Sequence, residues 1–401
     1  MEPTLRRLFN AAYSDAVYER YKKRLRDRVG DVPFRLAETP VFLPLALRDK
    51  LEVHAGEILA KLSERTSIDR MTPAIPARFH APGMDLLPTC AQVDFAIVRG
   101  PGGELDGRIV ELQGFPSLYA FSVEQARSWD EVLAELPGLS GPSFHPYFDG
   151  LDEAKAILRL KKTILAGHDP FEVVLLDLDP ESQKTRPDFQ ATRTLLGIDA
   201  VCPTELVREG RCLLRRKNGR LVPIRRIFNR VVFDELEAKR PSLPFAYTDA
   251  LDVSWCPHPN WYWVWSKYSL PALIHEAIPR ATLLSELAEV PEDLSRYVLK
   301  PLFSFAGGGV KIDVTRADVD AVPAEARGEW LLQEKIEYAR ELVTPEGHKV
   351  AVEVRVMCLR APGEPELRPS WNLIRLSRGK MHGVDHNRDL SWVGSSIGLW
   401  R

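Results

Sequence analysis

The segment YVLKPLFSFAGGGVKI, residues 297–312, has residue types that suit a phosphate chain. A strand pattern ends near Lys300, and a glycine-rich loop follows it with Gly307, Gly308 and Gly309 in a row. Consecutive glycines let backbone amides approach an anion closely, and a lysine at a strand end supplies a point charge. The combination suits a nucleoside triphosphate, although a plain glycine hairpin explains the same residues. It matches neither GxxxxGK[ST] nor GxGxxG, so a P-loop and a Rossmann dinucleotide site are not predicted.

Two segments on either side of this loop carry further polar residues. Lys267 follows the aromatic stretch WCPHPNWYWVW (255–265), at the start of a predicted helix where a lysine is usually solvated. The residues QEKI (333–336) lie in a predicted strand. An extended segment with a free backbone edge is able to read adenine through main-chain hydrogen bonds, but taken alone this is an ordinary edge strand.

A predicted β-hairpin carries two carboxylates and an amide that suit a divalent cation. QVDFAIVRG (92–100) and GRIVELQGF (107–115) have strand patterns, and PGGELDG between them is a strong turn signal. Asp94 lies on the first strand, whereas Glu111 and Gln113 lie two residues apart on the second and therefore share one face. Hard oxygen ligands of this kind suit Mg²⁺. A solvated hairpin face is the alternative interpretation.

The elements expected around these residues mix helices and strands. Helices are predicted over 3–30 and 47–67. FEVVLLDLDP (171–180) is a short apolar run ending in acids and proline, which is typical of a buried parallel strand. A helix (188–197) and two further strands (198–203 and 212–233) complete a predicted open-sheet α/β domain over about 160–258. After it we expect a helix over 266–278 and strands over 296–302, 310–314, 330–339 and 349–359.

Composition limits the class of protein. The 401 residues suggest two or three domains, and 54 Lys+Arg against 56 Asp+Glu give a net charge of -2. This balance argues against a general electrostatic grip on nucleic acid. No apolar run approaches the ~18 residues of a membrane helix, and the first residues lack the apolar core of a secretory signal. Five cysteines without CxxC spacing predict reduced thiols and a cytoplasmic location.

The amino-acid sequences of three segments, and their order along the chain, resemble those of the ATP-grasp superfamily. SKYSLPALIHEAIPRATLL, YVLKPLFSFAGGGV and WLLQEKIEY are similar to glutathionylspermidine synthases and glutathione synthetases in particular. In such enzymes two lysines hold phosphates, a glycine loop closes over them and a hinge binds adenine. The resemblance therefore implies ATP as cofactor, held by Lys267, Lys300, Ser304, Gly307, Gly308, Gly309, Gln333, Glu334, Lys335 and Ile336.

The hairpin resembles the metal-binding D…E-x-N strands of glutathionylspermidine synthases. This makes Asp94, Glu111 and Gln113 the expected Mg²⁺ ligands, with Gln113 standing where asparagine is usual. The resemblance also implies an arginine near Asp94, for which Arg78 and Arg99 are alternatives. After the hinge, Asp385-x-Asn387 is only a local imitation of the metal motif.

The chain order predicts a circularly permuted ATP-grasp fold, α/β (α+β) in class, because the metal strands precede the lysines. We expect residues 1–158 to hold an N-terminal helical region and the metal strands, and 159–258 to form an inserted open-sheet α/β substrate domain. Residues 259–401 would form the nucleotide-binding part. In the middle region, Arg225, Arg226 and Arg230 suit a carboxylate or phosphate, or else form a solvated basic strand.

The resemblance implies an ATP-dependent carboxylate–amine ligase that works through an acylphosphate. Its partners would be a small-molecule or peptide carboxylate and an amine, with neither nucleic acid nor membrane. Arg355 or Arg375 would stabilise the transferring phosphoryl group, and no protein nucleophile is needed. Two alternatives stay open. One is phosphotransfer to a small alcohol, and the other is a degenerate nucleotide-binding module, which the Gln113 departure keeps in view.

Overall fold

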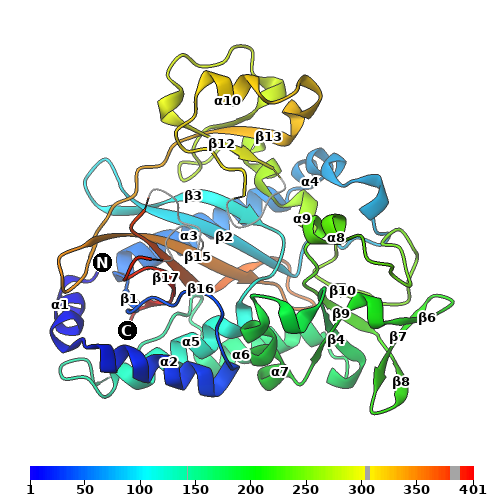
Figure 1. The fold of residues 1–401 in the computed structure, drawn as a ribbon, viewed down its shortest axis with the longest axis horizontal. Helices are drawn as coiled ribbons and strands as arrows, with labels where there is room; N and C mark the ends of the chain where they lie inside the picture. The colour runs from blue at the N-terminus through cyan, green and yellow to red at the C-terminus, as the bar shows by residue number, and fades with distance from the viewer. Residues whose placement is uncertain (142, 303–307, 380–388) are drawn as a thin grey trace.

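A computed structural model describes residues 1–141, 143–302, 308–379 and 389–401 (Figure 1). Its centre is a six-stranded sheet of order β17-β16-β15-β2-β3, in which β14 pairs with β15. Neighbouring strands are antiparallel, and β15 lies between β2 and β16. The strands are β2 (Cys90–Arg99), β3 (Leu105–Gln113), β14 (Leu342–Val343), β15 (Lys349–Leu359), β16 (Arg368–Ser377) and β17 (Gly394–Ser396).

The predicted hairpin is confirmed as β2 and β3. Its register places Asp94 opposite Glu111, so both side chains lie on the same face of the sheet. Beyond this pair the register shifts, because Phe95 pairs with Ile109 and Val110 is left as the extra residue of a β-bulge. The bulge lies directly beside the predicted metal residue Glu111.

Helices cover both faces of the central sheet. They are α1 (Pro3–Ala12), α2 (Asp15–Val29), α3 (Leu45–Ser63), α4 (Arg65–Met71), α5 (Tyr119–Leu133) and α6 (Glu153–Leu165). Helix α3 packs on the apolar face so closely that a Cβ at Gly107 would lie 2.5 Å from Leu51. Helix α5 lies on the opposite face, where Trp371 of β16 donates a 2.9 Å hydrogen bond to Ser122.

The single helix expected over 3–30 is wrong. The chain breaks at Tyr13 and Ser14, whose backbone is extended, and α2 starts anew with Ser14 as N-cap and Asp15 in its first turn. A serine followed by an acid is a helix start signal, which the apolar spacing alone concealed.

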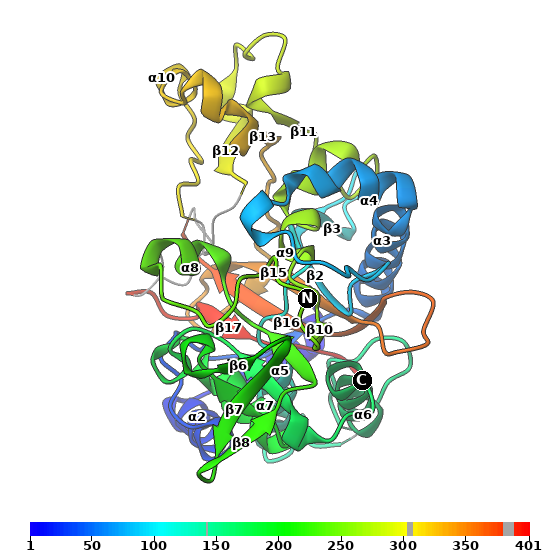
Figure 2. The same cartoon turned by 90° about the vertical axis from the view of Figure 1, so that its right-hand side faces the viewer.

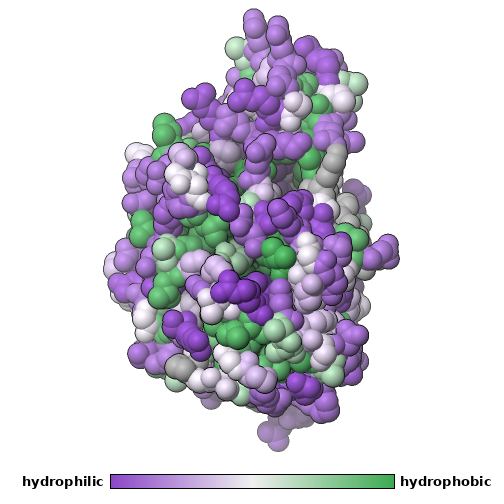
Figure 3. All heavy atoms as spheres, turned by 90° about the vertical axis from the view of Figure 1, so that its left-hand side faces the viewer, coloured by the Kyte–Doolittle hydropathy of each residue, from purple (hydrophilic) through white to green (hydrophobic). Residues whose placement is uncertain are grey.

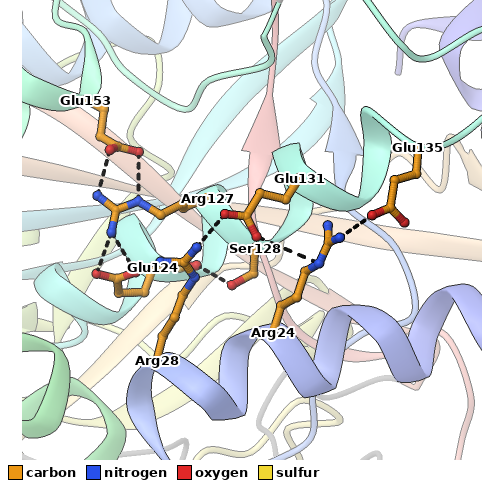
Figure 4. Close-up of polar contacts among 8 residues, drawn as sticks. All are labelled: Arg24, Arg28, Glu124, Arg127, Ser128, Glu131, Glu135 and Glu153. Atoms are coloured by element: carbon orange, nitrogen blue, oxygen red, sulfur yellow. Dashed lines mark hydrogen bonds and ion pairs between the residues drawn. The ribbon is translucent and has the colours of Figure 1, made fainter.

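Helix α2 is tied to α5 by a ladder of ion pairs (Figure 4). Arg28 pairs with Glu124 at 3.3 Å and with Glu131 at 2.5 Å. Arg127 bridges Glu124 at 3.0 Å and Glu153 at 2.6 Å, which extends the ladder to α6. Most of these side chains are partly exposed, so the ladder orients the helices more than it stabilises them.

The middle of the chain forms a parallel sheet of order β10-β9-β4-β5, flanked by a small antiparallel sheet, β6-β7-β8. The elements are β4 (Val173–Leu176), α7 (Arg186–Leu196), β5 (Asp199–Val201), β6 (Val207–Glu209), β7 (Cys212–Lys217), β8 (Arg220–Pro223), β9 (Arg226–Asn229), α8 (Phe233–Lys239) and β10 (Ser254–Cys256). The parallel strand predicted at 171–180 is thus confirmed. The single strand predicted over 212–233 is instead three, because Asn218 and Gly219 take positive φ and close a tight turn.

A small lobe projects from the body (Figures 1 and 2). The molecular face seen in Figure 3 is mostly hydrophilic. The lobe contains β11 (Ala281–Leu283), β12 (Tyr297–Pro301), α10 (Arg316–Asp320) and β13 (Trp330–Glu334), with strand order β11-β13-β12. Its own apolar core consists of Leu284, Leu294, Leu299, Val314, Val319, Val322 and Leu332. The strand expected over 310–314 is wrong, since only Lys311 bridges to Leu299.

The helix expected over 266–278 is also wrong. The structure has a short helix α9 (Trp261–Val264) and a 3-10 helix over Lys267–Ala272. Pro271 lacks an N–H group and disfavours a continuing α-helix, so the chain leaves helical geometry at Leu273.

The two end regions of the chain meet beside the central sheet. Strand β1 (Val41–Phe42) pairs in parallel with β18 (Gly398–Leu399). No helix among the described residues has the length and apolar character needed to cross a membrane.

Candidate functional site

The polar face of the central sheet holds a closed network of ion pairs. Asp94 on β2 accepts two 2.7 Å hydrogen bonds from Arg355 of β15, from Nε and from Nη2. Arg375 of β16 contacts both Asp94 and Glu353. Tyr338 donates a 3.1 Å hydrogen bond to the second carboxylate. The register brings these side chains together, because Arg355 lies opposite Asp94 and Arg375 lies opposite Glu353.

Burial and charge act in opposite directions on the two carboxyls. Burial raises the pKa of Asp94, but Arg355 and Arg375 outweigh it, so the pKa lies below its ordinary value. Burial raises the pKa of Glu353 above its ordinary value despite the same Arg375. The network is therefore a tightly held, mutually compensated cluster in which the ionised form is favoured more strongly at Asp94 than at Glu353.

The edge of the sheet next to this network brings three predicted residues together. Glu111 of β3 lies 3.4 Å from the Nζ of Lys267, which also donates to the carbonyl oxygen of Leu302 at 3.5 Å. Lys300 of β12 donates a 3.1 Å hydrogen bond to the carbonyl oxygen of Val110, the bulged residue. Two lysines from separate segments thus converge on one strand edge.

Glu111 and Lys267 line a small hollow in the described part of the chain. Gln113 lines it too, so the carboxylate and amide that sequence alternation placed on one face share one cavity. Its other walls are Leu112, Gly114, Phe115, Tyr262, Trp265, Ser266 and Leu302.

Lys300 is the most perturbed cation at this edge. Its side chain is buried, and desolvation lowers its pKa to about 8 although Glu111 acts in the opposite direction. The neighbouring charge of Lys267 lowers it further. Two buried lysines thus lie close together with one carboxylate, Glu111, beside them, and the positive charge that remains suits a polyanionic ligand.

Strands β12 and β13 place the other predicted nucleotide residues. Val298 lies opposite Gln333 and Lys300 opposite Leu331, so Gln333 and Lys300 share one face of the lobe. Gln333 is fully buried, and neither polar atom of its amide has a hydrogen-bond partner among the described residues. A buried, unsatisfied amide is rare in proteins, and here it lies on the same face as the lysine.

The remaining predicted hinge residues contact the lobe itself. The N–H of Glu334 donates to Arg280 O at 2.8 Å, and that of Lys335 donates to Arg296 O at 2.7 Å. Ile336 is half-buried just beyond β13. In the loop, Gly308 and Gly309 are exposed, and Gly309 takes a φ of +72° that favours glycine. Ser304 and Gly307 lie outside the described residues, as do Asp385 and Asn387.

Sequence reasoning missed the residue that seats the lysine segment, Gly114. Its N–H donates a 2.6 Å hydrogen bond to Trp265 O, and a Cβ there would lie 2.4 Å from Trp261 O. The backbone before Lys267 therefore packs directly on the end of β3, and a capping box between Ser266 and Ser269 starts the 3-10 helix. The glycine after Gln113 and the serine before the lysine were the available signals.

Several expected arginine roles are corrected. Arg355 and Arg375 are the arginines at Asp94, whereas Arg99 pairs with Glu341 and Arg78 with Glu237. The three arginines of the middle region are not a solvated strand as a group. Arg226 donates to the carbonyl oxygens of Ile164 and Thr163, and Arg230 pairs with Asp188. Arg230 is almost fully buried, so its charge is already compensated within the fold.

The residues fit Mg²⁺ in part. Glu111 and Gln113 offer oxygen ligands that line the same cavity as Lys267. Asp94 does not offer one, since both of its oxygens are held by arginines and its side chain is 1% exposed. We therefore keep Glu111 and Gln113 as candidate metal residues and assign Asp94 to the ion-pair network.

Comparison with known proteins establishes the fold class. No known family model matches the chain, and no curated protein does. A glutathione synthetase-like effector (GSS30) from Globodera pallida, solved in its apo form, matches with TM-score 0.59 and 13% identity, over 90% of this chain and 94% of that one. A putative gamma-glutamylcysteine synthetase from Methylobacillus flagellatus KT matches with TM-score 0.39 and 13% identity, over 90% and 89%. The first likeness shows that this chain has the mixed α/β fold of a glutathione synthetase-like protein, which confirms the predicted class.

Proposed function

We propose that this protein is an ATP-dependent carboxylate–amine ligase with a circularly permuted ATP-grasp arrangement. The observation that carries the proposal is the convergence of Lys267 and Lys300 on the strand edge that bears Glu111. These groups come from three separate segments, and Glu111 and Lys267 line a cavity next to which Lys300 is buried. The fold shared with a protein described as glutathione synthetase-like supports a synthetase by fold analogy alone.

The proposed chemistry joins a small-molecule or peptide acid to an amine. A carboxylate oxygen attacks the γ-phosphorus of ATP, ADP leaves, and the amine then displaces phosphate from the acylphosphate. Lys267 and Lys300 would neutralise phosphate oxygens, and the amide of Gln333, which has no partner within the described part of the chain, would face the base. Glu111 and Gln113 would hold a bound Mg²⁺, which would supply further charge neutralisation for the phosphates.

The two predicted catalytic arginines, Arg355 and Arg375, would have different roles. The guanidinium of Arg355 is committed to Asp94 through two hydrogen bonds and is buried, so it would position the sheet around the site. Arg375 retains 23% exposure of its side chain and is the arginine better placed to face a transferring phosphoryl group.

A second candidate is a nucleotide-binding module without turnover. The fixed pairing of Asp94 favours it, because this expected metal ligand has no oxygen left for an ion. The ligase and the module would share the nucleotide site and differ in chemistry.

The test separates binding from turnover. Calorimetry with Mg-ATP on the wild type, Lys300→Ala and Glu111→Ala should show micromolar binding that both substitutions weaken. A screen of acid and amine pairs should then release ADP and free phosphate in equal amounts. Binding without turnover across the screen would favour the module, and a folded wild type that binds no nucleotide would refute both candidates.

A further inference from the structure

A second cavity, the α8 cavity, lies between the 3-10 helix Ala77–Phe79 and the chain of α8 and the residues after it. Its volume is about 670 Å³, within the ~300–1,000 Å³ typical of small-molecule sites. It shares no lining residue with the hollow that Glu111 and Lys267 line. The α8 cavity is therefore a separate space from the proposed nucleotide site.

Aromatic rings form one wall of the α8 cavity. The ring of Tyr247 lies 6.0 Å from that of Phe79 and 5.5 Å from that of Phe245, between centroids. Phe233 packs behind them, with its centroid 4.9 Å from Tyr247 and 4.9 Å from Tyr262. Tilted and edge-on ring contacts at such distances stabilise an aromatic cluster. The wall is therefore a packed apolar surface on which the ring of a ligand is able to lie.

One polar group in this wall is unsatisfied. Tyr247 is 3% exposed, and its hydroxyl has no hydrogen-bond partner within the described part of the chain. Burial raises the pKa of this hydroxyl well above its ordinary value, and the carboxyl of Asp177 acts in the same direction. The hydroxyl therefore stays protonated and is available as a donor. A buried donor without an acceptor is costly, so an acceptor oxygen on a ligand would be favoured here.

Positive charge exceeds negative charge among the residues that line the α8 cavity. Arg78 forms an ion pair with Glu237, so these two charges compensate each other. Arg240 is exposed and forms no ion pair or side-chain hydrogen bond within the described ranges. Its guanidinium is a planar group of donors that matches a carboxylate. The cavity thus combines apolar walls with one uncompensated cation.

The backbone of Arg240 is strained. It has φ +46° and ψ +51° at the C-cap of α8, a left-handed conformation that glycine usually provides at the end of a helix. A residue with a Cβ adopts it at a steric cost, and residues held in this way cluster at ligand sites. The strain therefore agrees with a binding role for the arginine.

The geometry points to a binding site in the α8 cavity for a small aromatic carboxylic acid that carries a second acceptor oxygen, such as an aryl keto acid. The ring would contact the wall that Phe79 and Phe245 form. The carboxylate would accept hydrogen bonds from Arg240, and the second oxygen would accept one from the hydroxyl of Tyr247. The site does not depend on the proposed ligase chemistry, and its test needs no nucleotide.

The test uses 4-oxo-4-phenylbutyrate, which has a ring, a ketone oxygen and a carboxylate. It is titrated by calorimetry into the full-length protein without nucleotide. We expect one site per chain with Kd below about 1 mM, an affinity within the reach of a ligand of this size.

Three variants test the parts of the site. Arg240→Gln removes the guanidinium from an exposed position, and Tyr247→Phe removes a hydroxyl that has no partner among the described residues, so both should retain the fold. Each should weaken binding at least about threefold. Ala246→Trp fills the cavity from an exposed lining position and should abolish binding. Ser242→Trp, at an exposed residue of the same loop that does not line the cavity, is the matched control and should bind as the wild type does.

Three results would overturn the assignment. The first is a folded wild type that shows no saturable binding of the probe in the millimolar range. The second is an unchanged affinity in Ala246→Trp, which would place the probe elsewhere. The third is an unchanged affinity in both Arg240→Gln and Tyr247→Phe, which would exclude this class of ligand. Lys300→Met should bind the probe as the wild type does, and a loss there would move the probe to the proposed nucleotide site.

Discussion

Two neighbouring regions of the central sheet contain the same kinds of side chain and use them differently. In the middle of the sheet, Asp94 is sealed between Arg355 and Arg375. At the edge, Glu111 has one lysine at 3.4 Å and lines a cavity. The two carboxylates lie opposite each other in the register, so strand position alone does not separate them. The partners of a carboxylate therefore determine whether it stabilises the fold or remains available to a ligand.

The largest effect should come from breaking the sealed region. Arg355→Leu would leave Asp94 buried with part of its charge uncompensated, and we expect a loss of about 3 to 5 kcal/mol of unfolding free energy. Denaturant titration followed by tryptophan fluorescence would measure it. The double variant Asp94→Asn with Arg355→Leu should recover much of the loss. An Arg355→Leu variant as stable as the wild type would contradict the conclusion that Arg355 compensates the buried charge of Asp94.

The pH dependence of stability should report the buried lysine at the open edge. Lys300 has a folded pKa of about 8 against an ordinary 10.5, so below pH 8 it is charged in both states and its burial penalty acts in full. As pH rises from about 8 to 10.5, the unfolded state binds more protons, and stability rises by up to about 3 kcal/mol. The measurement is the wild-type unfolding free energy minus that of Lys300→Met. A flat difference over this window would contradict it.

Nucleotide binding should depend on the same lysine. Lys300→Met removes a cation aimed at the strand edge, and we expect ATP affinity to fall about 100-fold, or ~2.7 kcal/mol. Lys311→Met, an exposed lysine of the same lobe, is the control and should bind as the wild type does. Calorimetry on both variants would check this. Equal losses would mean that the lobe was disturbed as a whole.

A smaller effect is expected when the charge of Glu111, and not that of Asp94, is removed. Glu111→Gln keeps the side-chain shape, removes one charge and leaves Asp94 untouched. We expect unfolding free energy to fall by about 1 to 3 kcal/mol, because Glu111 is the carboxylate beside two buried lysines, and the gain in ATP affinity on adding Mg²⁺ to fall about tenfold. ATP titrations with Mg²⁺ and with a chelator would measure it. A magnesium effect of wild-type size would remove Glu111 from the metal residues.

The smallest effect should come from the exposed ladder between α2 and α5. Arg24 pairs with Glu131 at 3.8 Å and contacts Glu135 with both partners partly exposed (Figure 4). Arg24→Ala should therefore cost less than about 1 kcal/mol, and the cost should shrink in high salt. Denaturant titrations at two salt concentrations would check it. A loss of unfolding free energy close to that of Arg355→Leu would show that ion pairing, and not burial, determines the size of the effect.

Local patterns predicted the hairpin and the parallel strand, because alternation and a turn signal are properties of adjacent residues. The helix expected after Trp265 was wrong because it ignored a local signal, Pro271. The partners of Asp94 could not be read locally, since they come from two strands that lie 261 and 281 residues further along the chain. The sequence resemblance placed Lys267, Lys300 and Glu111 in one site, and the structure brings them together. The pairing of Asp94 depends on the sheet order β15-β2-β3, which no local pattern specifies.

That long separation between Asp94 and Arg355 has a consequence for how the chain is made. At synthesis rates of ~5–20 residues per second, Asp94 leaves the ribosome roughly 13 to 50 s before its bidentate partner. During that interval the β2–β3 hairpin has no neighbour on its β2 side and carries an uncompensated carboxylate. We expect this charge to oppose pairing of an otherwise apolar strand edge with other chains, as charges on exposed strand edges do in general. The group that later locks the sheet thus first protects it.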